Sequence, residues 1–501
     1  MSFKEYKTLD LTRVSEYISN FWEIDKTFEK SISSRDDKEF VFYEGPPSAN
    51  GMPGIHHVMA RTIKDIFCRY KTLKGFKVNR KAGWDTHGLP IELGVEKELN
   101  ISKEDIGSKI TIKDYNEACK NAVMKYTGVW NDLTKRIGYW VDMDNPYITY
   151  KSKYIETVWW LLKNLYDKKL IYKGYSVQPY SPKAGTGLSS HELNQPGTYQ
   201  DITDTTVTAQ FECEDESIPE FLKKYSKIYI LAWTTTPWTL PSNTALTVGK
   251  KIEYCLIKTF NLYTHKAVNV ILAKDLITKV FKLNFKEIEN ESDLVFKNEK
   301  TIPFLICETF SGEKIVGIKY HQIWKDAPLP ENNPENAFRV ISGDFVTTED
   351  GTGIVHTAPT FGADDAVAAK NASPEVPPML IRNTNDELVP LVDLQGKFVS
   401  ELGTLGGKFV KNEYYEQGTA PEKSVDVEIA IKLKEENKAF RVEKYTHSYP
   451  NCWRTDKPVL YYPLNSWFVK VTDNKQNLIS NNDKINWKPK STGEGRFGNW
   501  L

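Results

Sequence analysis

Two adjacent histidines close a turn rich in glycine and proline near the start of the chain. The stretch runs from Glu44 to His57 and reads EGPPSANGMPGIHH. It follows an apolar run at 40–43, interpreted as a strand, and precedes a segment at 58–73 with helical periodicity. Free N–H groups at a helix N-terminus, the helix dipole and imidazole donors favour a phosphate ligand. The stretch therefore predicts a nucleotide-phosphate site, with an ordinary strand-to-helix loop as the alternative.

A second polar cluster follows at 80–92 and reads RKAGWDTHGLPIE. It places Trp84, Asp85, His87 and Glu92 after an expected strand at 77–79. The carboxyl edge of a parallel sheet is where open α/β folds bind ligands, so this cluster predicts a ligand site. For Asp85 alone, a helix N-cap is the alternative.

Two further stretches have the composition of a reactive site. One, at 233–243, reads WTTTPWTLPSN and ends a strand in consecutive hydroxyls. The other, at 351–365, reads GTGIVHTAPTFGADD. In it, His356 follows an expected strand, and after a turn two carboxylates stand at the start of an expected helix. Threonines are also ordinary strand formers, and Asp364 or Asp365 is a possible helix cap. The occurrence of both stretches in one region favours a site.

The segments around these motifs show two kinds of secondary-structure pattern, one helical and one rich in strands. Helices are expected at 11–35, 112–139 and 151–170, the last with an apolar side in the core that includes Trp159 and Trp160. From about 200 to 400 the pattern predicts a β-rich insert with strands at 205–211, 228–234, 254–257, 268–272 and 338–340. Residues 385–445 are charged and irregular, and 466–470 begins another strand.

The bulk composition bounds the class of protein. A chain of 501 residues is expected to form two or three domains. Its 66 basic and 66 acidic residues cancel, so no global field indicates a polyanionic partner. Six cysteines without a CxxC pair suit a reducing compartment. The N-terminal MSFKEYKTLDL has no apolar core of a secretory signal, and no apolar run approaches the roughly 18 residues of a membrane span, so we expect a cytoplasmic protein.

The motifs together carry a resemblance to a known family. EGPPSANGMPGIHH, GWDTHGLPIE, WTTTPWTLPSN, GTGIVHTAPTFGADD and SYPNCWR…NSWF occur in the order found in isoleucyl-tRNA synthetases, and the likeness covers essentially the whole chain. The resemblance implies an α/β fold: a Rossmann-type class I catalytic domain, here incomplete, that is interrupted by a large β-rich editing insert. It implies a first catalytic part at 1–190, the editing domain at 191–440 and a truncated return into the catalytic domain at 441–501.

The resemblance also implies a reaction. Such enzymes use ATP, with Mg²⁺, to activate L-isoleucine and transfer it to tRNA(Ile), and they hydrolyse misattached valine. One methylene gives only about 1–3 kcal/mol of discrimination, a limit for which these enzymes are the usual illustration, so a second site must remove valine. The expected partners are tRNA(Ile), L-isoleucine and ATP, with no membrane, and the expected state is a monomer.

Site residues follow from the resemblance position by position. Asp85 would hold the substrate ammonium, in an amino-acid site shared with Gly45, Pro46, Pro47, Trp84, His87 and Gly88. His57 would be catalytic and would meet the ATP phosphates beside Gly54 and His56. In the insert, Asp365 would anchor the ammonium of the wrong amino acid and His356 would select its small side chain. The ester and the attacking water would be positioned by Thr234, Thr235 and Thr236.

Three departures from the family pattern matter. The HIGH signature reads GIHH at 54–57, which leaves open whether His56 replaces the missing first histidine. The zinc-binding pairs of related enzymes are Ser181…Ala184 and Cys452…Thr455 here, and one thiolate does not build a tetrahedral site, so we expect no structural zinc. The KMSKS loop and the anticodon-binding helices are absent from the 501 residues, so this segment alone is not expected to make the adenylate at a useful rate.

Two other interpretations stay open on the sequence. A non-catalytic module that binds nucleotide or RNA on the same fold needs no hydrolytic residues, and Thr234–Thr236 with Asp365 argue against it. A valyl or leucyl synthetase predicts that a valine or leucine adenylate analogue outcompetes the isoleucine one.

Overall fold

The computed structural model describes residues 5, 8–35, 38–383 and 385–501, so part of the N-terminal peptide named above lies outside the described residues. The chain forms two compact units. Unit 1 comprises the chain up to Tyr172 together with Val469–Leu501, and unit 2 is Lys173–Phe468. The domain boundaries expected at 190 and 440 both fall within unit 2. That the editing domain begins and ends at these residues stays a prediction. In the described part of the chain, no helix is both long and apolar enough to span a membrane.

Unit 1 begins with two helices where one was predicted. Helix α1 (Leu11–Asp25) starts at Asp10, whose carboxylate accepts the N–H of Arg13 at 3.1 Å. Lys26 then adopts a left-handed conformation with φ 54°, and α2 (Thr27–Ser33) follows. A left-handed residue does not continue a right-handed helix, so the apolar stripe of 11–35 is divided between two axes.

The α/β part of unit 1 is built on a parallel pair of strands, β1 (Lys81–Trp84) and β2 (Asp142–Ile148). The predicted strands at 40–43 and 77–79 were wrong, because residues 40–43 belong to no strand and the segment 77–79 has only the single bridge of Lys77 to Glu39. The helices around the pair are α3 (Ile55–Leu73), α4 (Leu89–Leu99), α5 (Ile112–Val123), α6 (Thr127–Arg136) and α7 (Ser152–Asp167). Near the end of the chain are α12 (Lys475–Asn482) and α13 (Gly498–Trp500).

Helix α7 corrects a second expectation. Its apolar side was predicted to lie in the core, yet Trp159 is 70% exposed and Trp160 62% exposed. None of its described residues is buried. The apolar composition of 151–170 was therefore a correct signal for a helix and a wrong one for burial, since periodicity reports an amphipathic shape and not what covers it.

Unit 2 contains a large mixed sheet that confirms the predicted strands. The order of the main path is β10-β11-β8-β9-β6-β13-β7-β12, and β5 joins this path beside β6. The bounds are β5 Tyr199–Glu212, β6 Ile228–Thr234, β7 Ala245–Val248, β8 Glu253–Phe260, β9 Ala267–Ala273, β10 Phe285–Glu287, β11 Ile302–Ser311, β12 Arg339–Ser342 and β13 Ile354–Thr357.

Shorter elements complete unit 2. Two small sheets have the orders β18-β3-β4 and β14-β15. Their strands and the remaining short elements are β3 Ile171–Ser181, β4 Thr186–Gly187, α8 Ser190–Leu193, α9 Ile277–Val280, α10 Ala363–Asn371, β14 Leu380–Arg382, β15 Leu388–Pro390, β17 Lys457–Pro458 and β18 Leu460–Val469.

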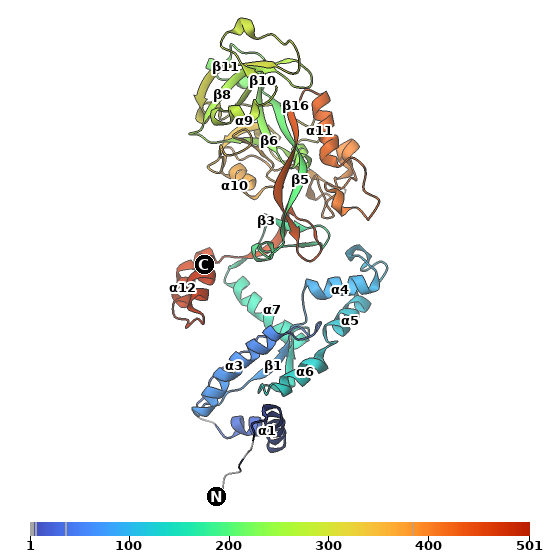
Figure 1. Cartoon of the computed structure of the whole chain (residues 1–501), viewed down its shortest axis with the longest axis vertical. Coiled ribbons are helices and arrows are strands. Elements are labelled where there is room, and N and C mark those ends of the chain that lie inside the picture. The colour runs from blue at the N-terminus through green and yellow to red at the C-terminus, as the bar shows by residue number, and fades with distance from the viewer. Residues whose placement is uncertain (1–4, 6–7, 36–37, 384) are drawn as a thin grey trace. The chain divides into compact units, whose positions relative to one another are not determined.

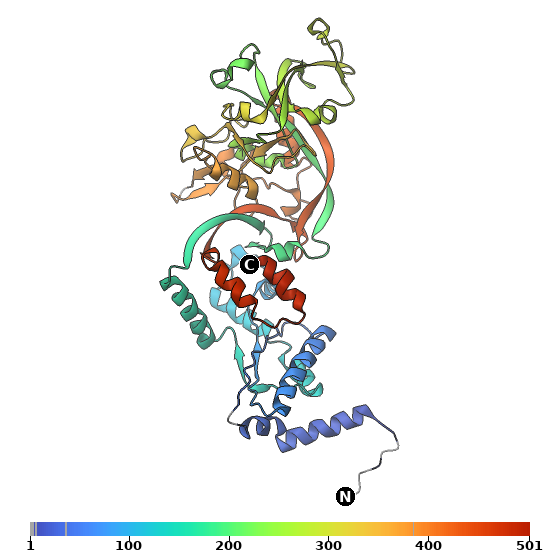
Figure 2. The ribbon, with the colours of Figure 1, turned by 90° about the vertical axis from the view of Figure 1, so that its left-hand side faces the viewer.

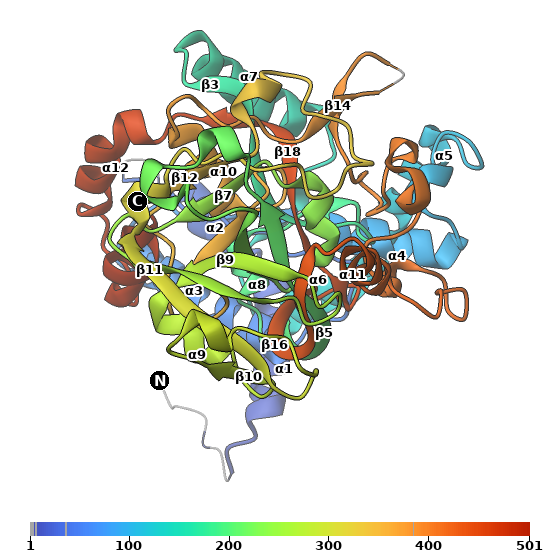
Figure 3. The same cartoon turned by 90° about the horizontal axis from the view of Figure 1, so that it is seen from above.

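A long antiparallel ribbon joins the two ends of the β-rich region. Strand β16 (Ala439–Cys452) pairs with β5 from Ala439–Ala209 to Pro450–Tyr199. Figures 1 and 2 show the two strands running side by side, and Figure 3 shows α11 (Val425–Glu435) next to them. The region 385–445 was expected to be irregular, and α11 and the start of β16 correct that expectation. Charges alternate with apolar residues there because only one side of each element is buried.

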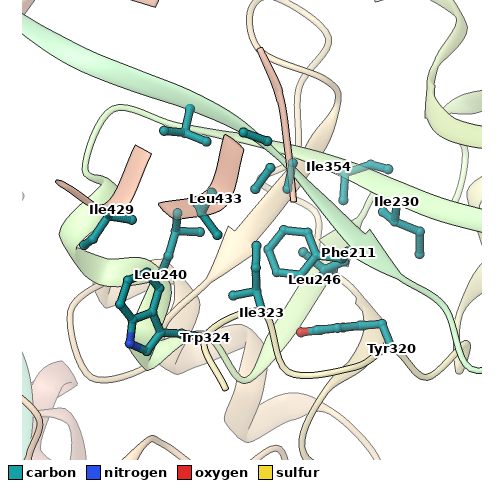
Figure 4. Packing of buried hydrophobic residues seen from close by; sticks show 14 of the residues in the cluster. Phe211, Ile230, Leu240, Leu246, Tyr320, Ile323, Trp324, Ile354, Ile429 and Leu433 are labelled. Atoms are coloured by element: carbon teal, nitrogen blue, oxygen red, sulfur yellow. The ribbon is translucent and has the colours of Figure 1, made fainter. Parts of the chain in front are cut away.

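The core of unit 2 is apolar and continuous. It gathers side chains from the sheet and from α11. Figure 4 shows Phe211, Ile230, Leu246 and Ile354 of four strands in one cluster with Ile429 and Leu433 of the helix. Phe211 is fully buried and packs edge-on against Tyr320, with the ring centroids 5.3 Å apart. This core supplies the rigid frame on which the polar turns of unit 2 are mounted.

Phe211→Ala is expected to destabilise unit 2 by about 3–5 kcal/mol, because it leaves a cavity that the surrounding strands fill only in part. Leu394→Ala is the control, since Leu394 is 52% exposed and its truncation should change stability by no more than about 0.5 kcal/mol. Chemical denaturation followed by tryptophan fluorescence measures both. Equal midpoints for the two variants would contradict this account of the core.

Candidate functional site

In unit 1, the turn before α3 is held from below by Trp130 of α6. The indole is 1% exposed, and its Nε1–H donates to the carbonyl of Gly51 at 2.9 Å. The N–H of Tyr126 donates to the carbonyl of Ala49 at 3.0 Å. The predicted glycine- and proline-rich turn is therefore fixed by a helix more than seventy residues further along the chain, which no local pattern indicated.

His57 lies in the first turn of α3 and caps it. Its Nδ1 accepts the backbone N–H of Gly54 at 2.9 Å, and its ring meets Trp130 edge-on at 4.7 Å. Because Nδ1 accepts, the ring proton is on Nε2. Burial, followed by the charges of His56 and Arg61, lowers the pKa of His57 below its ordinary value. The ring is thus a neutral N–H donor at a helix N-terminus.

Gly54 and His56 are coupled by geometry. A Cβ atom built on Gly54 would lie 2.9 Å from Cε1 of His56, closer than real contacts allow. The His56 ring itself lies 3.8 Å from that of His57, between centroids. A side chain at 54 would therefore require the exposed His56 ring to turn aside. The structure does not test whether His56 takes the place of the missing first histidine of the HIGH signature.

The structure brings the second predicted cluster against the first. The N–H of Asp85 donates to the carbonyl of Pro47 at 3.0 Å, and the Ser48 hydroxyl donates to the carbonyl of Asp85 at 2.8 Å. Trp84 is buried with Ala49 and Trp130. Helix α4 begins after Gly88, so Asp85 is not its N-cap, and its side chain is exposed.

Other predicted residues of unit 1 surround this junction. Gly45 has open space where a side chain would begin, and the neighbouring Glu44 carboxylate accepts from Tyr139 and pairs with Lys64. A cavity of about 200 Å³ lies there, lined among others by Glu44, Pro47, Arg61, Trp84 and Tyr139. Pro46 precedes Pro47 in the same turn.

Thr149 is a residue of this site that the sequence did not indicate. It follows β2, and its Oγ1 meets His87 Nδ1 at 2.8 Å and accepts the N–H of Thr86 at 2.9 Å. Parallel β1 and β2 end at the same edge, which is why their following residues meet. The signal was missed because β2 itself was not predicted.

In unit 2, the consecutive threonines form a tight hydrogen-bonded turn at the end of β6. The N–H of Thr236 donates to Oγ1 of Thr234 at 3.0 Å. The Thr239 hydroxyl donates to the carbonyl of Thr236 at 2.8 Å, and the short helix Pro237–Ser242 continues from there. Thr234 is buried, whereas Thr235 and Thr236 are half-buried.

His356 is held in one tautomer by a chain of hydrogen bonds. Asn243 Nδ2 donates to the carbonyl of Ala245 and to His356 Nδ1, both at 2.8 Å, while Asn243 Oδ1 accepts from Tyr320 at 2.7 Å. These partners fix the amide orientation, so Nδ1 is bare and Nε2–H donates to Thr239 Oγ1 at 3.0 Å. Burial lowers the pKa of His356 to about 3, and the imidazole is neutral under physiological conditions.

Asp365 lies in the first turn of α10, and its carboxylate turns back to the strand that carries His356. Oδ2 accepts the N–H of Ala358 at 2.8 Å. Burial is the main cause that raises the pKa of Asp365 to about 6; the Ala358 N–H opposes this rise and the charge of Asp364 adds to it. Among the ion pairs of the described residues, none joins Asp365 to a lysine, arginine or histidine. The helix-cap alternative is wrong for Asp365, since Gly362 precedes α10 as its N-cap.

The predicted residues of unit 2 thus form one cluster. Thr234 and Thr236 connect through Thr239 to His356, and Ala358 connects the end of the same strand to Asp365. Thr239, Asn243 and Tyr320 belong to this site but were not predicted as site residues. The first two lie inside the motif WTTTPWTLPSN, whereas Tyr320 stands in no motif and is found only from the fold.

The two turns at the zinc-pair positions are held by backbone and hydroxyl groups. Ser181 Oγ accepts the N–H of Ala184 at 3.2 Å, and the carbonyl of Cys452 accepts the N–H of Thr455 at 3.0 Å. Within the described ranges, no three or more histidine, cysteine or acidic side chains gather in a metal-ligating group. The expectation of no structural zinc stays a prediction.

The fold and the sequence motifs agree with the comparison to known proteins. The family "tRNA synthetases class I (I, L, M and V)" matches residues 17–501, and the chain belongs to this family. The resemblance inferred from the motifs and the expected class I fold are therefore confirmed.

Within this family, the chain is similar to individual proteins that share one name. The chain is 56% identical over 514 residues to a protein of Cytophaga hutchinsonii and 54% identical over 519 residues to one of Porphyromonas gingivalis, both named isoleucine–tRNA ligase. Each match covers 100% of this chain and 45% of the relative. The chain thus spans less than half the length of these curated relatives.

His356 should keep its proton on Nε2 and stay neutral from about pH 4 to pH 9, because the Asn243 amide occupies Nδ1 and burial opposes protonation. Nitrogen-15 NMR of histidine-labelled protein measures this, with His356→Gln to assign the signal among the eight histidines. A His356 ring protonated on Nδ1, or titrating near pH 6, would show that the hydrogen-bond chain is misassigned.

Proposed function

We propose that this chain is part of an isoleucine–tRNA ligase that activates L-isoleucine with ATP and Mg²⁺ and transfers it to tRNA(Ile). The names of the relatives and the five motifs support the proposal. The six cysteines are all free thiols, in keeping with a reducing compartment such as the cytoplasm. We further propose that unit 2 hydrolyses valine attached to that tRNA.

The observation that carries the hydrolytic function is the Asp365 carboxylate. It is partly buried, it accepts one backbone N–H, and no cationic side chain of the described residues pairs with it. A desolvated carboxylate that keeps its charge gains from a cation, and the α-ammonium of an aminoacyl ester is a cation of suitable size. The neighbouring hydroxyls and neutral imidazole are suited to the remainder of that ester.

In this proposal, the threonines of the turn orient the ester and a water molecule. The water oxygen bonds to the carbonyl carbon, the bond to the ribose oxygen breaks, and a proton from the water passes to that oxygen. The products are valine and tRNA with a free ribose hydroxyl. His356 bounds the side-chain pocket as an uncharged, immobile ring, so a larger side chain meets a wall that does not yield.

In unit 1, the groups that would bind the activating substrates are the exposed Asp85 and the neutral His57. Asp85 would hold the ammonium of isoleucine close to the Pro46–Pro47 turn, together with Trp84, His87 and Gly88. His57 would donate Nε2–H to an ATP phosphate at the N-terminus of α3, where the helix dipole adds to the attraction. Both roles are proposals that rest on the contacts described above.

Asp365→Ala is expected to lower the hydrolysis of valyl-tRNA(Ile) by at least roughly 100-fold, since the ester loses the group that orients it. Asp364→Ala is the matched control, because Asp364 is exposed and lies one residue away on the same helix turn. Release of labelled valine by the 501-residue chain measures both. If the wild-type chain releases no valine above the spontaneous rate, the hydrolytic function is wrong and the binding-module interpretation is favoured.

Hydrolysis is also expected to fall below about pH 6. The carboxylate must be ionised to hold an ammonium, its pKa is raised to about 6, and protonation therefore removes the active form as the pH drops through that value. The pH dependence of kcat/KM, from pH 5 to 7.5 with the spontaneous rate subtracted, tests this. A rate that stays flat down to pH 5 would contradict the assignment of Asp365.

A further inference from the structure

Unit 2 contains a buried charged pair outside all five motifs. Lys411 and Asp426 are each 4% exposed. Lys411 Nζ lies 2.9 Å from Oδ2 of Asp204 on β5 and 3.9 Å from Oδ2 of Asp426 in the first turn of α11. Burying such charges costs free energy that their attraction often fails to recover, so stability alone is a poor explanation for the pair.

The second oxygen of Asp426 shows what the pair holds. Oδ1 accepts the backbone N–H of Trp238 at 2.9 Å, across 188 residues of sequence. Trp238 is the second residue of the short helix Pro237–Ser242, and Pro237 has no N–H to give. Asp426 therefore satisfies the first free donor at the start of that helix with a carboxyl oxygen, which makes a stronger hydrogen bond when the group is ionised than when it is protonated.

The helix so fixed bears the reactive turn. Thr236 immediately precedes it, and Thr239 lies within it. Thr239 in turn receives Nε2–H of His356 and donates to the carbonyl of Thr236. A shift of the Trp238 backbone would therefore move the hydroxyls and the imidazole contact together.

We propose that Lys411 is a positioning residue for the hydrolytic site: its ammonium fixes the Asp426 carboxylate, and that carboxylate fixes the turn bearing Thr236 and Thr239. The proposal rests on the hydrolytic function proposed above and extends it to residues that touch no substrate.

The electrostatics give the proposal a measurable sign. Burial raises the pKa of Asp426, while the Lys411 ammonium and the Trp238 N–H lower it. Asp204 and Glu413 face the same carboxylate and raise its pKa, and Tyr449 and His447 of β16 contact Lys411 and Asp204. Without Lys411, Asp426 is expected to hold its proton to higher pH and to release the turn.

The test compares hydrolysis of valyl-tRNA(Ile) by the 501-residue chain in four variants. Lys411→Met should lower the rate near neutral pH by roughly 10- to 100-fold, since small displacements of orienting groups cost that much. Asp426→Asn keeps an acceptor for Trp238 and needs no ammonium, so its loss should stay within about threefold. The double variant should match Asp426→Asn. Lys408→Met is the control, because Lys408 pairs with Glu428 of α11 at 2.7 Å but does not contact Asp426.

The pH profile separates positioning from a general loss of structure. The acid limb of Lys411→Met should lie at higher pH than that of the wild type, and the limb of Asp426→Asn should not. If Lys411→Met does not fold, Asp426→Asn still tests the proposal. A hydrolysis rate of Asp426→Asn more than about threefold below the wild type overturns the proposal, and so does an acid limb of Asp426→Asn at higher pH than that of the wild type.

The outcomes distinguish this inference from the function beneath it. Wild-type hydrolysis with an unchanged rate in Lys411→Met leaves the hydrolytic function in place and overturns the positioning role. Equal and additive losses in Lys411→Met and Asp426→Asn also overturn it, because the two residues then do not act through one another. A wild-type chain that releases no valine overturns the hydrolytic function, and the inference falls with it.

Discussion

One hydrogen bond, from the Asn243 amide to Nδ1 of His356, fixes the tautomer of the imidazole in the proposed hydrolytic site of unit 2. Because the amide nitrogen is also held by the carbonyl of Ala245, it has no alternative orientation, and the imidazole must present N–H to Thr239. A protonated ring would place two donors face to face. The cluster therefore contains one charge of its own, on Asp365, and all its other polar groups are neutral and directed.

The two units hold the residues of their proposed sites in opposite ways. In unit 1 the backbone of the turn is tied down by buried Trp130 and by Glu44, while Asp85, His56 and His87 stay exposed at its edge. In unit 2 the groups are buried and fixed through their own side chains. Exposed groups on a rigid turn suit a substrate that brings its own large charge, whereas buried groups suit the discrimination of small apolar differences.

The elements that could be predicted from the sequence are those that a local residue pattern encodes. The strands around Ile228–Thr234 and Val268–Leu272 were predictable because β-branched runs between turns report burial directly. Strand β16 and helix α11 were not, since their partner β5 lies more than two hundred residues away and their exposed faces carry charge. For the same reason the motifs located Thr236, His356 and Asp365, while Tyr320, Thr149 and Lys411 act through contacts that only the fold creates.

The β5–β16 ribbon has a kinetic consequence. Thr203 and Thr446 face each other across 243 residues of sequence, so during synthesis at roughly 5–20 residues per second the first strand precedes its partner by about 10–50 s. Residues Val207–Glu212 pair meanwhile with β6, but the register assigns 199–206 to β16 alone among the described strands. For that interval a half-strand with unpaired backbone groups must stay in solution. Its sequence, YQDITDTT, is polar and carries two aspartates, which is the composition that keeps a waiting edge from joining another chain.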